Sequence, residues 1–247
     1  MMSSSSHRID RFATTRWSLA MQAVATTPDE AQVALAELVQ RYWYPVYAYA
    51  RRSGHAPVIA EDIARSFIGS LMRDFRDGGS EAGRGEFRRY LLGRLNAFLG
   101  RDWRETTDAP GEGEISAPPD LEARYLQDLA DSGSTTPEQA YERAFALEVI
   151  ARALHRLRSE ARRTGHQAMY AALEPLLARE PAPGELDLTA QSLSSRPLAL
   201  IVALKRLRQR LRELAGEELA DTVASREQLQ AEQATLHAVL TGKKPLP

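Results

Sequence analysis

The stretch TPDEAQVALAELVQRYWYPVYAYARR, residues 27–52, shows the clearest helical pattern in the chain. It opens with a threonine cap, a proline at the first helical position and two acids in the first turn. The apolar residues that follow fall on one face of a helix; they are Val33, Leu35, Leu38, Val39, Tyr42, Trp43, Val46 and Tyr47. Because Pro45 lies inside this pattern, we expect the helix to kink there.

The same helical periodicity continues through most of the 247 residues. Aromatic residues make up only 7%, while Ala, Leu, Arg and Glu dominate, which disfavours a β-sandwich or barrel. Further helices are expected at about 58–75, 85–104, 121–130, 137–163, 169–177, 186–193, 196–223 and 227–240. The sequence therefore predicts an all-α protein with two helical bundles joined by an acidic linker, the second bundle holding a helix-turn-helix.

Composition divides the chain into segments. Residues 105–138 hold nine acids against one base, with several prolines and glycines, which is typical of a linker. A Thr-Pro-Glu helix start recurs at residues 136–138. The expected order is a disordered tail (1–13), a first helical domain (14–104), an acidic linker (105–136), a second domain (137–225), and a C-terminal helix and tail (226–247).

Several classes of function have no support. The chain has no cysteine, so a thiolate metal site and a cysteine nucleophile are excluded. Its five histidines are scattered, and the phosphate-binding, dinucleotide-binding and hydrolase motifs are missing, so we expect neither an enzyme nor a cofactor or metal site. No apolar run reaches the ~20 residues that span a bilayer, so a cytoplasmic protein without a membrane partner is expected.

Charge is balanced overall but locally clustered. The formal net charge is −1, from 32 basic and 33 acidic residues. Residues 84–104 nevertheless hold six arginines and two acids among several aromatic residues, and residues 205–212 hold five bases and no acid. Such basic segments suit contact with a phosphate backbone. Taken alone, the first segment is better explained as an ordinary amphipathic helix, and the second also fits a helical hairpin, which is a common arrangement.

Six segments together carry a family pattern: TTRWSL (14–19), LAELVQRYWYPVYAYARR (35–52), AED (60–62), GEFRRYLL (85–92), YERAFAL (141–147) and RLRQR (206–210). They resemble the corresponding segments of bacterial sigma factors of the extracytoplasmic-function type. Within that family the chain is similar to the branch with a TTRWSL start and an RYWYP block. The resemblance spans roughly residues 14–223.

The resemblance implies a role for each bundle. The first would bind the clamp of RNA polymerase core through Glu61, Asp62 and Phe67. It would also read and melt the −10 element of promoter DNA through Arg88, Arg89, Tyr90, Arg94, Arg101, Trp103 and Arg104. The second would read the −35 element by a helix-turn-helix that includes Arg196, Lys205, Arg206, Arg208 and Arg210. The acidic linker would thread the polymerase, where it can mimic nucleic acid.

Two segments diverge from the family pattern. The clamp-binding helix reads EDIARSFI (61–68), without a polar pair and second acid that relatives carry. The turn before the reading helix of the second bundle, together with the start of that helix, has the sequence SSRPLALI (194–201), which is unusually apolar. Ser66 stands where relatives often carry an acid, so it is a candidate phosphorylation site for a Ser/Thr kinase.

The expected function is that of an alternative sigma factor that directs promoter-specific initiation, with an anti-sigma factor as a further candidate partner. The alternative is a degenerate sigma-like adaptor that binds polymerase or a regulator without reading DNA.

Overall fold

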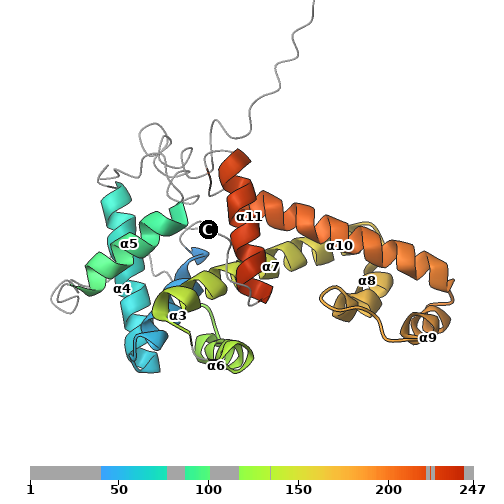
Figure 1. Ribbon diagram of the computed structural model, residues 1–247, viewed down its shortest axis with the longest axis horizontal. Coiled ribbons are helices and arrows are strands. Elements are labelled where there is room, and N and C mark those ends of the chain that lie inside the picture. Colours follow the sequence, from blue (N-terminus) through green and yellow to red (C-terminus); the bar gives the residue numbers. More distant parts are fainter. Residues whose placement is uncertain are drawn as a thin grey trace, which may run out of the picture. The chain divides into compact units, whose positions relative to one another are not determined.

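The computed structural model describes residues 40–76, 87–100, 117–133, 135–220, 223 and 226–241. Within these ranges every regular element is helical (Figure 1), which confirms the all-α class. The elements are α3 (Trp43–Arg52), α4 (Pro57–Arg76), α5 (Phe87–Leu99), α6 (Leu121–Ser132), α7 (Pro137–Arg163), α8 (Gln167–Leu173), the 3₁₀ turn η1 (Glu174–Leu176), α9 (Glu185–Ser192), α10 (Pro197–Ala220) and α11 (Arg226–Thr241). The part of the expected helix 27–52 that precedes residue 40 lies outside the described residues.

The chain forms two compact units. The first comprises residues 1–148 and 219–247, and the second comprises residues 149–218. These divisions fall inside α7 and α10, whereas composition placed the boundary in the acidic segment 105–136. Both long helices therefore contribute to both units.

The start of α7 follows the sequence signal. The side-chain oxygen of Thr136 accepts a hydrogen bond from the backbone N–H of Gln139 at 3.2 Å. In return, the Gln139 side chain accepts one from the N–H of Thr136 at 2.9 Å. This reciprocal capping box satisfies two backbone donors that the first turn would leave unpaired, so the helix begins at Pro137 as expected.

Pro45 has a different effect from the expected kink. The chain makes a turn at Arg41–Tyr42, and α3 starts afresh at Trp43. Pro45 consequently stands in the first turn of α3, where its missing N–H has no intrahelical partner to lose. A proline farther inside a helix would clash with the carbonyl four residues before it, and the turn avoids that clash.

Helix α3 is the centre of the first unit. Every residue from Trp43 to Ala50 is buried, so α3 is covered on all sides. Just before it, the ring of Tyr42 packs edge-on against Phe87 of α5 and stacks on Phe145 of α7, with both pairs of ring centroids 5.3 Å apart. Aromatic contacts of this kind contribute about 0.5–1.5 kcal/mol each beyond the area that they bury.

The tyrosine hydroxyls of α3 all find acceptors. Tyr44 donates to Asp128, and Tyr47 donates to Oε2 of Glu122 at 2.6 Å. Tyr49 donates to Oδ1 of Asn96 at 2.6 Å. A buried hydroxyl without a partner costs about 1–3 kcal/mol, so these three bonds are a condition for burying α3.

Helix α6 belongs to the first unit, although it lies within the predicted acidic linker. Leu121 and Tyr125 are buried. The guanidinium of Arg51 in α3 binds Glu122 through two hydrogen bonds of 2.8 Å. Glu122 and Asp128 of this segment thus form hydrogen bonds inside the fold, and they are not available as a mimic of nucleic acid. Residues 105–116, which carry other acids of the segment, lie outside the described residues.

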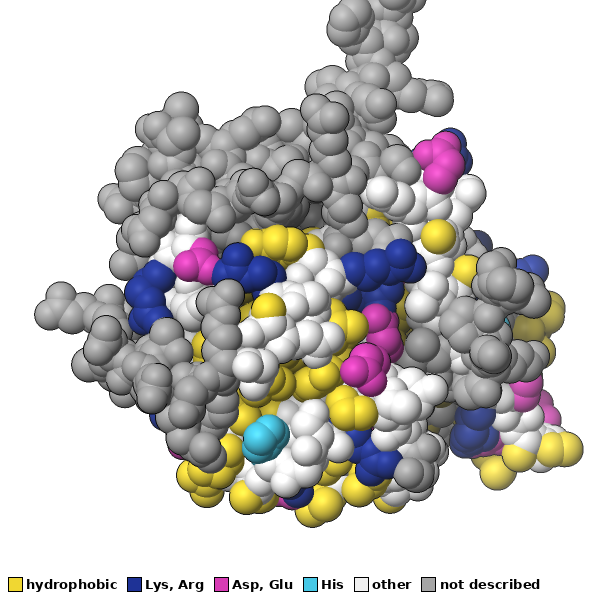
Figure 2. Space-filling model, turned by 60° about the vertical axis from the view of Figure 1, so that its left-hand side comes forward, with side chains coloured by type: hydrophobic (Ala, Val, Ile, Leu, Met, Phe, Trp, Pro, Cys, Tyr) yellow, Lys and Arg dark blue, Asp and Glu magenta, His cyan; other side chains and the backbone are white. Residues whose placement is uncertain are grey.

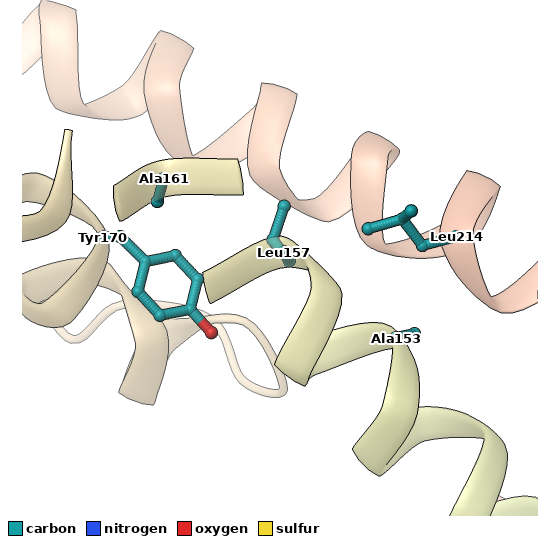
Figure 3. Packing of buried hydrophobic residues seen from close by; sticks show 5 residues of the cluster. All are labelled: Ala153, Leu157, Ala161, Tyr170 and Leu214. Carbon is teal, nitrogen blue, oxygen red and sulfur yellow. The ribbon is translucent and has the colours of Figure 1, made fainter. Parts of the chain in front are cut away.

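The second unit has its own apolar core. Figure 3 shows Tyr170 beside Leu157 and Ala161, with Leu214 reaching from α10 toward α7. A second cluster joins Leu173 and Leu176 to Ala190 of α9 and to Leu200 and Leu204 of α10. On α10 the core positions Leu200, Leu204, Leu207, Leu211 and Leu214 are three or four residues apart, so one face of the helix is fixed against the core.

None of the described helices is both long enough and apolar enough to cross a bilayer.

We expect Glu122→Gln to destabilise the chain by roughly 1–3 kcal/mol at pH 7, since Arg51 and Tyr47 lose a charged acceptor. The bond from Arg51 holds the pKa of Glu122 below its ordinary value. This contribution is therefore complete above the unfolded pKa of about 4.3 and is lost as pH falls through the folded value.

Urea denaturation between pH 7 and pH 3 measures both effects, and the variant should show the weaker dependence on pH. Asp131→Asn, an exposed change on the same helix, is the control. Equal stability of Glu122→Gln and wild type at pH 7 would contradict the prediction.

Candidate nucleic-acid and partner interface

Arg88, a predicted phosphate contact on α5, is buried instead. Its side chain is 4% exposed and forms ion pairs with Glu142 of α7 and with Glu232 of α11, the latter through two 2.9 Å hydrogen bonds. Its guanidinium also lies 5.5 Å from the ring centre of Phe145. Arg88 therefore joins three helices of the first unit and has no surface to offer to DNA in this conformation.

The surroundings of Arg88 are apolar and aromatic. Tyr141 donates its hydroxyl to the backbone carbonyl of Arg88 at 3.2 Å. Burial raises the pKa of both Tyr42 and Tyr141 far above the ordinary value, so both rings stay neutral. A charge at such a place needs a partner, and Glu232 supplies one while it is itself only 3% exposed.

Sequence reasoning missed Glu232, although a signal was present. On α11 this acid stands three residues after Leu229 and four before Leu236, which places it in the apolar stripe of the helix. An acid at such a position indicates a buried partner of opposite charge. The sequence alone did not indicate that Arg88 was that partner.

The other basic residues of α5 differ in their exposure and pairing. Arg94 pairs with Asp74 of α4 and lies 6.0 Å from the ring centre of Tyr90, a half-buried residue. Arg89 is exposed. On the described part of the face drawn in Figure 2, basic side chains lie beside acidic ones and are separated by hydrophobic ones. Arg101, Trp103 and Arg104 lie outside the described residues.

Helix α4 presents two of the three predicted clamp contacts. Glu61 and Asp62 are half-exposed, and Arg65 of the next turn binds them at 2.8 Å and 3.8 Å. Phe67 is 2% exposed and packs edge-on against Phe98 of α5, with ring centroids 5.6 Å apart. Phe67 is thus a core residue and not a surface contact, because it faces α5 instead of solvent. Ser66, beside it, is half-buried.

The connection from α9 to α10 is a tight four-residue turn. Ser194 adopts a left-handed conformation with φ of 50°. The N–H of Ser195 donates to the carbonyl of Ala190 at 2.9 Å, and the N–H of Ser194 donates to that of Gln191 at 3.2 Å. These two bonds form a Schellman motif, which ends α9 and starts α10 almost at once.

Two of the predicted DNA contacts on α10 are used inside the second unit. Arg208 binds the carboxylate of Glu180 at 2.7 Å and donates to the backbone carbonyls of Leu176 and Arg179, the first at 2.9 Å. Arg210 forms a two-pronged pair with Glu160 of α7, at 2.7 Å and 2.9 Å. That pair lowers the pKa of Glu160 and raises the pKa of Arg210. A DNA phosphate would have to displace these partners in order to use the same donors of either guanidinium.

Arg196, just before α10, and Lys205 and Arg206 in the first half of α10 remain exposed. Among them lie apolar side chains with unusual exposure: Leu198 is 71% exposed, Ile201 is 50% and Val202 is 42%. Leu200, which belongs to the same apolar segment 194–201, is fully buried in the core. The exposed face of early α10 is therefore basic and apolar together.

Metal binding has no described site. In the part of the chain that the structure describes, no three His, Asp or Glu side chains gather closely enough to hold an ion.

Comparison with known proteins gives no relative from which a role can be transferred: no family model, no curated protein and no solved structure matches this chain. The residues of the chain itself must therefore support any assignment of function.

Replacing an internally bonded arginine of α10 should lower the stability of the chain more than replacing an exposed one. We expect Arg208→Ala to cost roughly 1–2 kcal/mol, because two backbone carbonyls and Glu180 lose their donor. Arg206→Ala, on the same helix and exposed, should change stability by no more than about 0.5 kcal/mol. Thermal and urea denaturation of the full chain measure the difference, and equal losses in the two variants would refute this division.

Proposed function

We propose that this chain is a sigma-type transcription initiation factor, acting in the cytoplasm on RNA polymerase core and promoter DNA. The observation that carries the proposal is the α9–turn–α10 pair, in which Arg196 at the end of the turn and Lys205 and Arg206 on α10 stand exposed. Its size and order of elements suit a helix-turn-helix, whose second helix enters the major groove of DNA. The sequence segments described above support the same assignment.

On this proposal α10 binds DNA mainly through phosphates. Arg196 and Arg206 would each neutralise a phosphate, and Lys205 would add a third contact. Base readout would depend on apolar side chains such as Leu198 and Ile201, which can contact thymine methyl groups but make no hydrogen bonds to base edges. We therefore expect weak sequence preference from the second unit alone.

The first unit would contribute at the melted promoter. Arg89 and Tyr90 lie at the start of α5, and Arg101, Trp103 and Arg104 follow beyond its described end. Aromatic rings next to arginines suit unpaired bases and their phosphates. Arg94 could join them only if it left Asp74, and Arg88 is not part of the proposal.

Polymerase binding would depend on Glu61 and Asp62 of α4. Arg65 already shares their charge, so a basic clamp surface would have to compete with it. Phosphorylation of Ser66 by a Ser/Thr kinase would add about −1.5 to −2 charges on this helix at neutral pH. That phosphate would pair with Arg65 or strengthen the acidic surface, and either change favours the clamp.

The second candidate function is an adaptor that binds polymerase or a regulator without reading DNA. It is favoured by the internal pairing of Arg88, Arg208 and Arg210 and by the exposed leucine and valine of early α10. Run-off transcription with core polymerase on the DNA upstream of its own gene separates the two. Specific initiation supports the initiation factor, and binding to core without initiation supports the adaptor.

DNA binding by the full chain should depend on three exposed basic residues, Arg196 just before α10 and Lys205 and Arg206 on it. The triple change Arg196→Ala, Lys205→Ala and Arg206→Ala should lower the slope of log K against log salt by about two to three units, roughly 0.9 for each lost phosphate contact. Titration of labelled duplex at several salt concentrations measures the slope. The double variant Arg196→Lys with Arg206→Lys keeps the charge and should keep the slope; if the triple variant does so too, α10 does not bind the duplex.

Removal of Arg65 should strengthen polymerase binding. Arg65→Ala frees Glu61 and Asp62 from an exposed pair worth up to about 1 kcal/mol, so affinity for core should rise roughly two- to fivefold. Arg73→Ala, which removes an exposed charge from the same helix, is the control. Surface plasmon resonance with immobilised core measures both. An unchanged affinity in Arg65→Ala, or an equal rise in the control, would remove these carboxylates from the contact.

A further inference from the structure

The second unit contains an open groove of about 730 Å³ among α7, α8 and α10. Its lining is mainly apolar and includes Leu157 and Ala161 of α7, Met169 of α8, and Leu198 and Val202 of α10. Leu157 and Ala161 are drawn in Figure 3, where they lie beside Tyr170, a third lining residue. All of these residues belong to one compact unit, so the groove is a property of that unit alone.

The groove leaves apolar surface in water. Leu198 is 71% exposed and Val202 is 42% exposed, although each lies on a helix whose other face is packed into the core. Full burial of such a side chain contributes roughly 1.5–3 kcal/mol. Duplex DNA offers phosphates and base edges, which cannot fill a concave surface of leucine, valine, methionine and alanine. The groove therefore fits a ligand that brings apolar side chains of its own.

The charge around the groove selects the kind of ligand. Three arginines line it, namely Arg196, Arg206 and Arg210, against one carboxylate, Glu160. Glu160 is already paired with Arg210. Among the residues that the structure describes, Arg196 and Arg206 form no ion pair. The groove is thus apolar within and positive at its rim, which complements a ligand that is apolar on one face and acidic at its edges.

We propose that this groove binds an acidic amphipathic helix of a partner protein. Apolar residues of that helix, spaced at i, i+3 or i+4, and i+7, would pack on Leu157, Val202 and Leu198. Its Asp or Glu side chains would pair with Arg196 and Arg206. The site does not depend on whether α10 reads DNA. If α10 does so, helix and duplex share Arg196 and Arg206 and exclude each other.

The test uses the full chain and a labelled synthetic peptide of about 16 residues, ~24 Å long as a helix. The peptide carries leucines at i, i+3 and i+7 and glutamates at its flanking positions. A matched peptide carries lysines in place of the glutamates. Fluorescence anisotropy at low and moderate salt should show binding of the glutamate peptide at least tenfold tighter than that of the lysine peptide. A tenfold change corresponds to about 1.4 kcal/mol.

The variants place the peptide in the groove. Leu198→Glu should weaken the glutamate peptide at least tenfold, and Arg206→Glu should weaken it and reduce its salt dependence. Leu188→Glu is the matched control, because Leu188 is 69% exposed on α9 but does not line the groove, and it should change affinity less than twofold.

Three results would overturn the proposal: no binding of the glutamate peptide, equal binding of both peptides, or equal weakening by Leu198→Glu and Leu188→Glu. If the chain binds both peptides with equal affinity and releases them when a small apolar dye is added, the groove is a site for small apolar ligands instead. Duplex binding is measured in parallel. If the full chain binds duplex DNA but not the glutamate peptide, the proposed peptide site is wrong and the proposed initiation factor is unaffected. If the chain binds the peptide but not DNA, the proposed initiation factor is wrong and the peptide site is unaffected.

Discussion

The burial of α3 is the constraint on which the first unit depends. Burying a helix on every side is costly for each polar group left without a partner, and α3 carries three tyrosine hydroxyls and ends in two arginines. Asp128 and Glu122 of α6 and Asn96 of α5 provide the acceptors. Helix α6 is therefore held against α3 by the same bonds that make the burial of α3 possible. This explains why an acidic, proline-flanked segment is part of a packed core.

A related constraint decides the fate of the arginines. A guanidinium that lies near packed helices binds carboxylates and carbonyls of its own chain, since leaving it unpaired there would be costly. Arg88, Arg208 and Arg210 follow this rule, with partners that are far away in sequence. Arg206 of α10 and Arg196, the residue just before α10, are exposed and form no ion pair with the described residues. Counting basic residues along the sequence thus overestimates the number of basic side chains that are exposed for contact with DNA.

Early α10 combines two kinds of recognition on one helix. Its exposed bases suit phosphate oxygens or carboxylates, and its exposed Leu198 and Val202 suit an apolar partner. On the proposals made above, α10 would be a reading helix with one face fixed in the core and another open to a ligand. The apolar groove beside it would add a protein ligand. Nucleic acid and protein would then compete for this surface of the second unit.

The sequence by itself determined the helical class, most helix positions from α4 onward, and the start of α7, because periodicity and capping act over a few residues. It also placed α9, the turn and α10 within a few residues of their observed limits. Only the tertiary structure decided that Phe67 and Leu200 are core residues, that α6 packs on α3, and that Glu232 neutralises Arg88. Those outcomes depend on pairs of residues up to 144 positions apart. Local pattern carries no information about which distant carboxylate a given arginine will meet, and packing alone settles that choice.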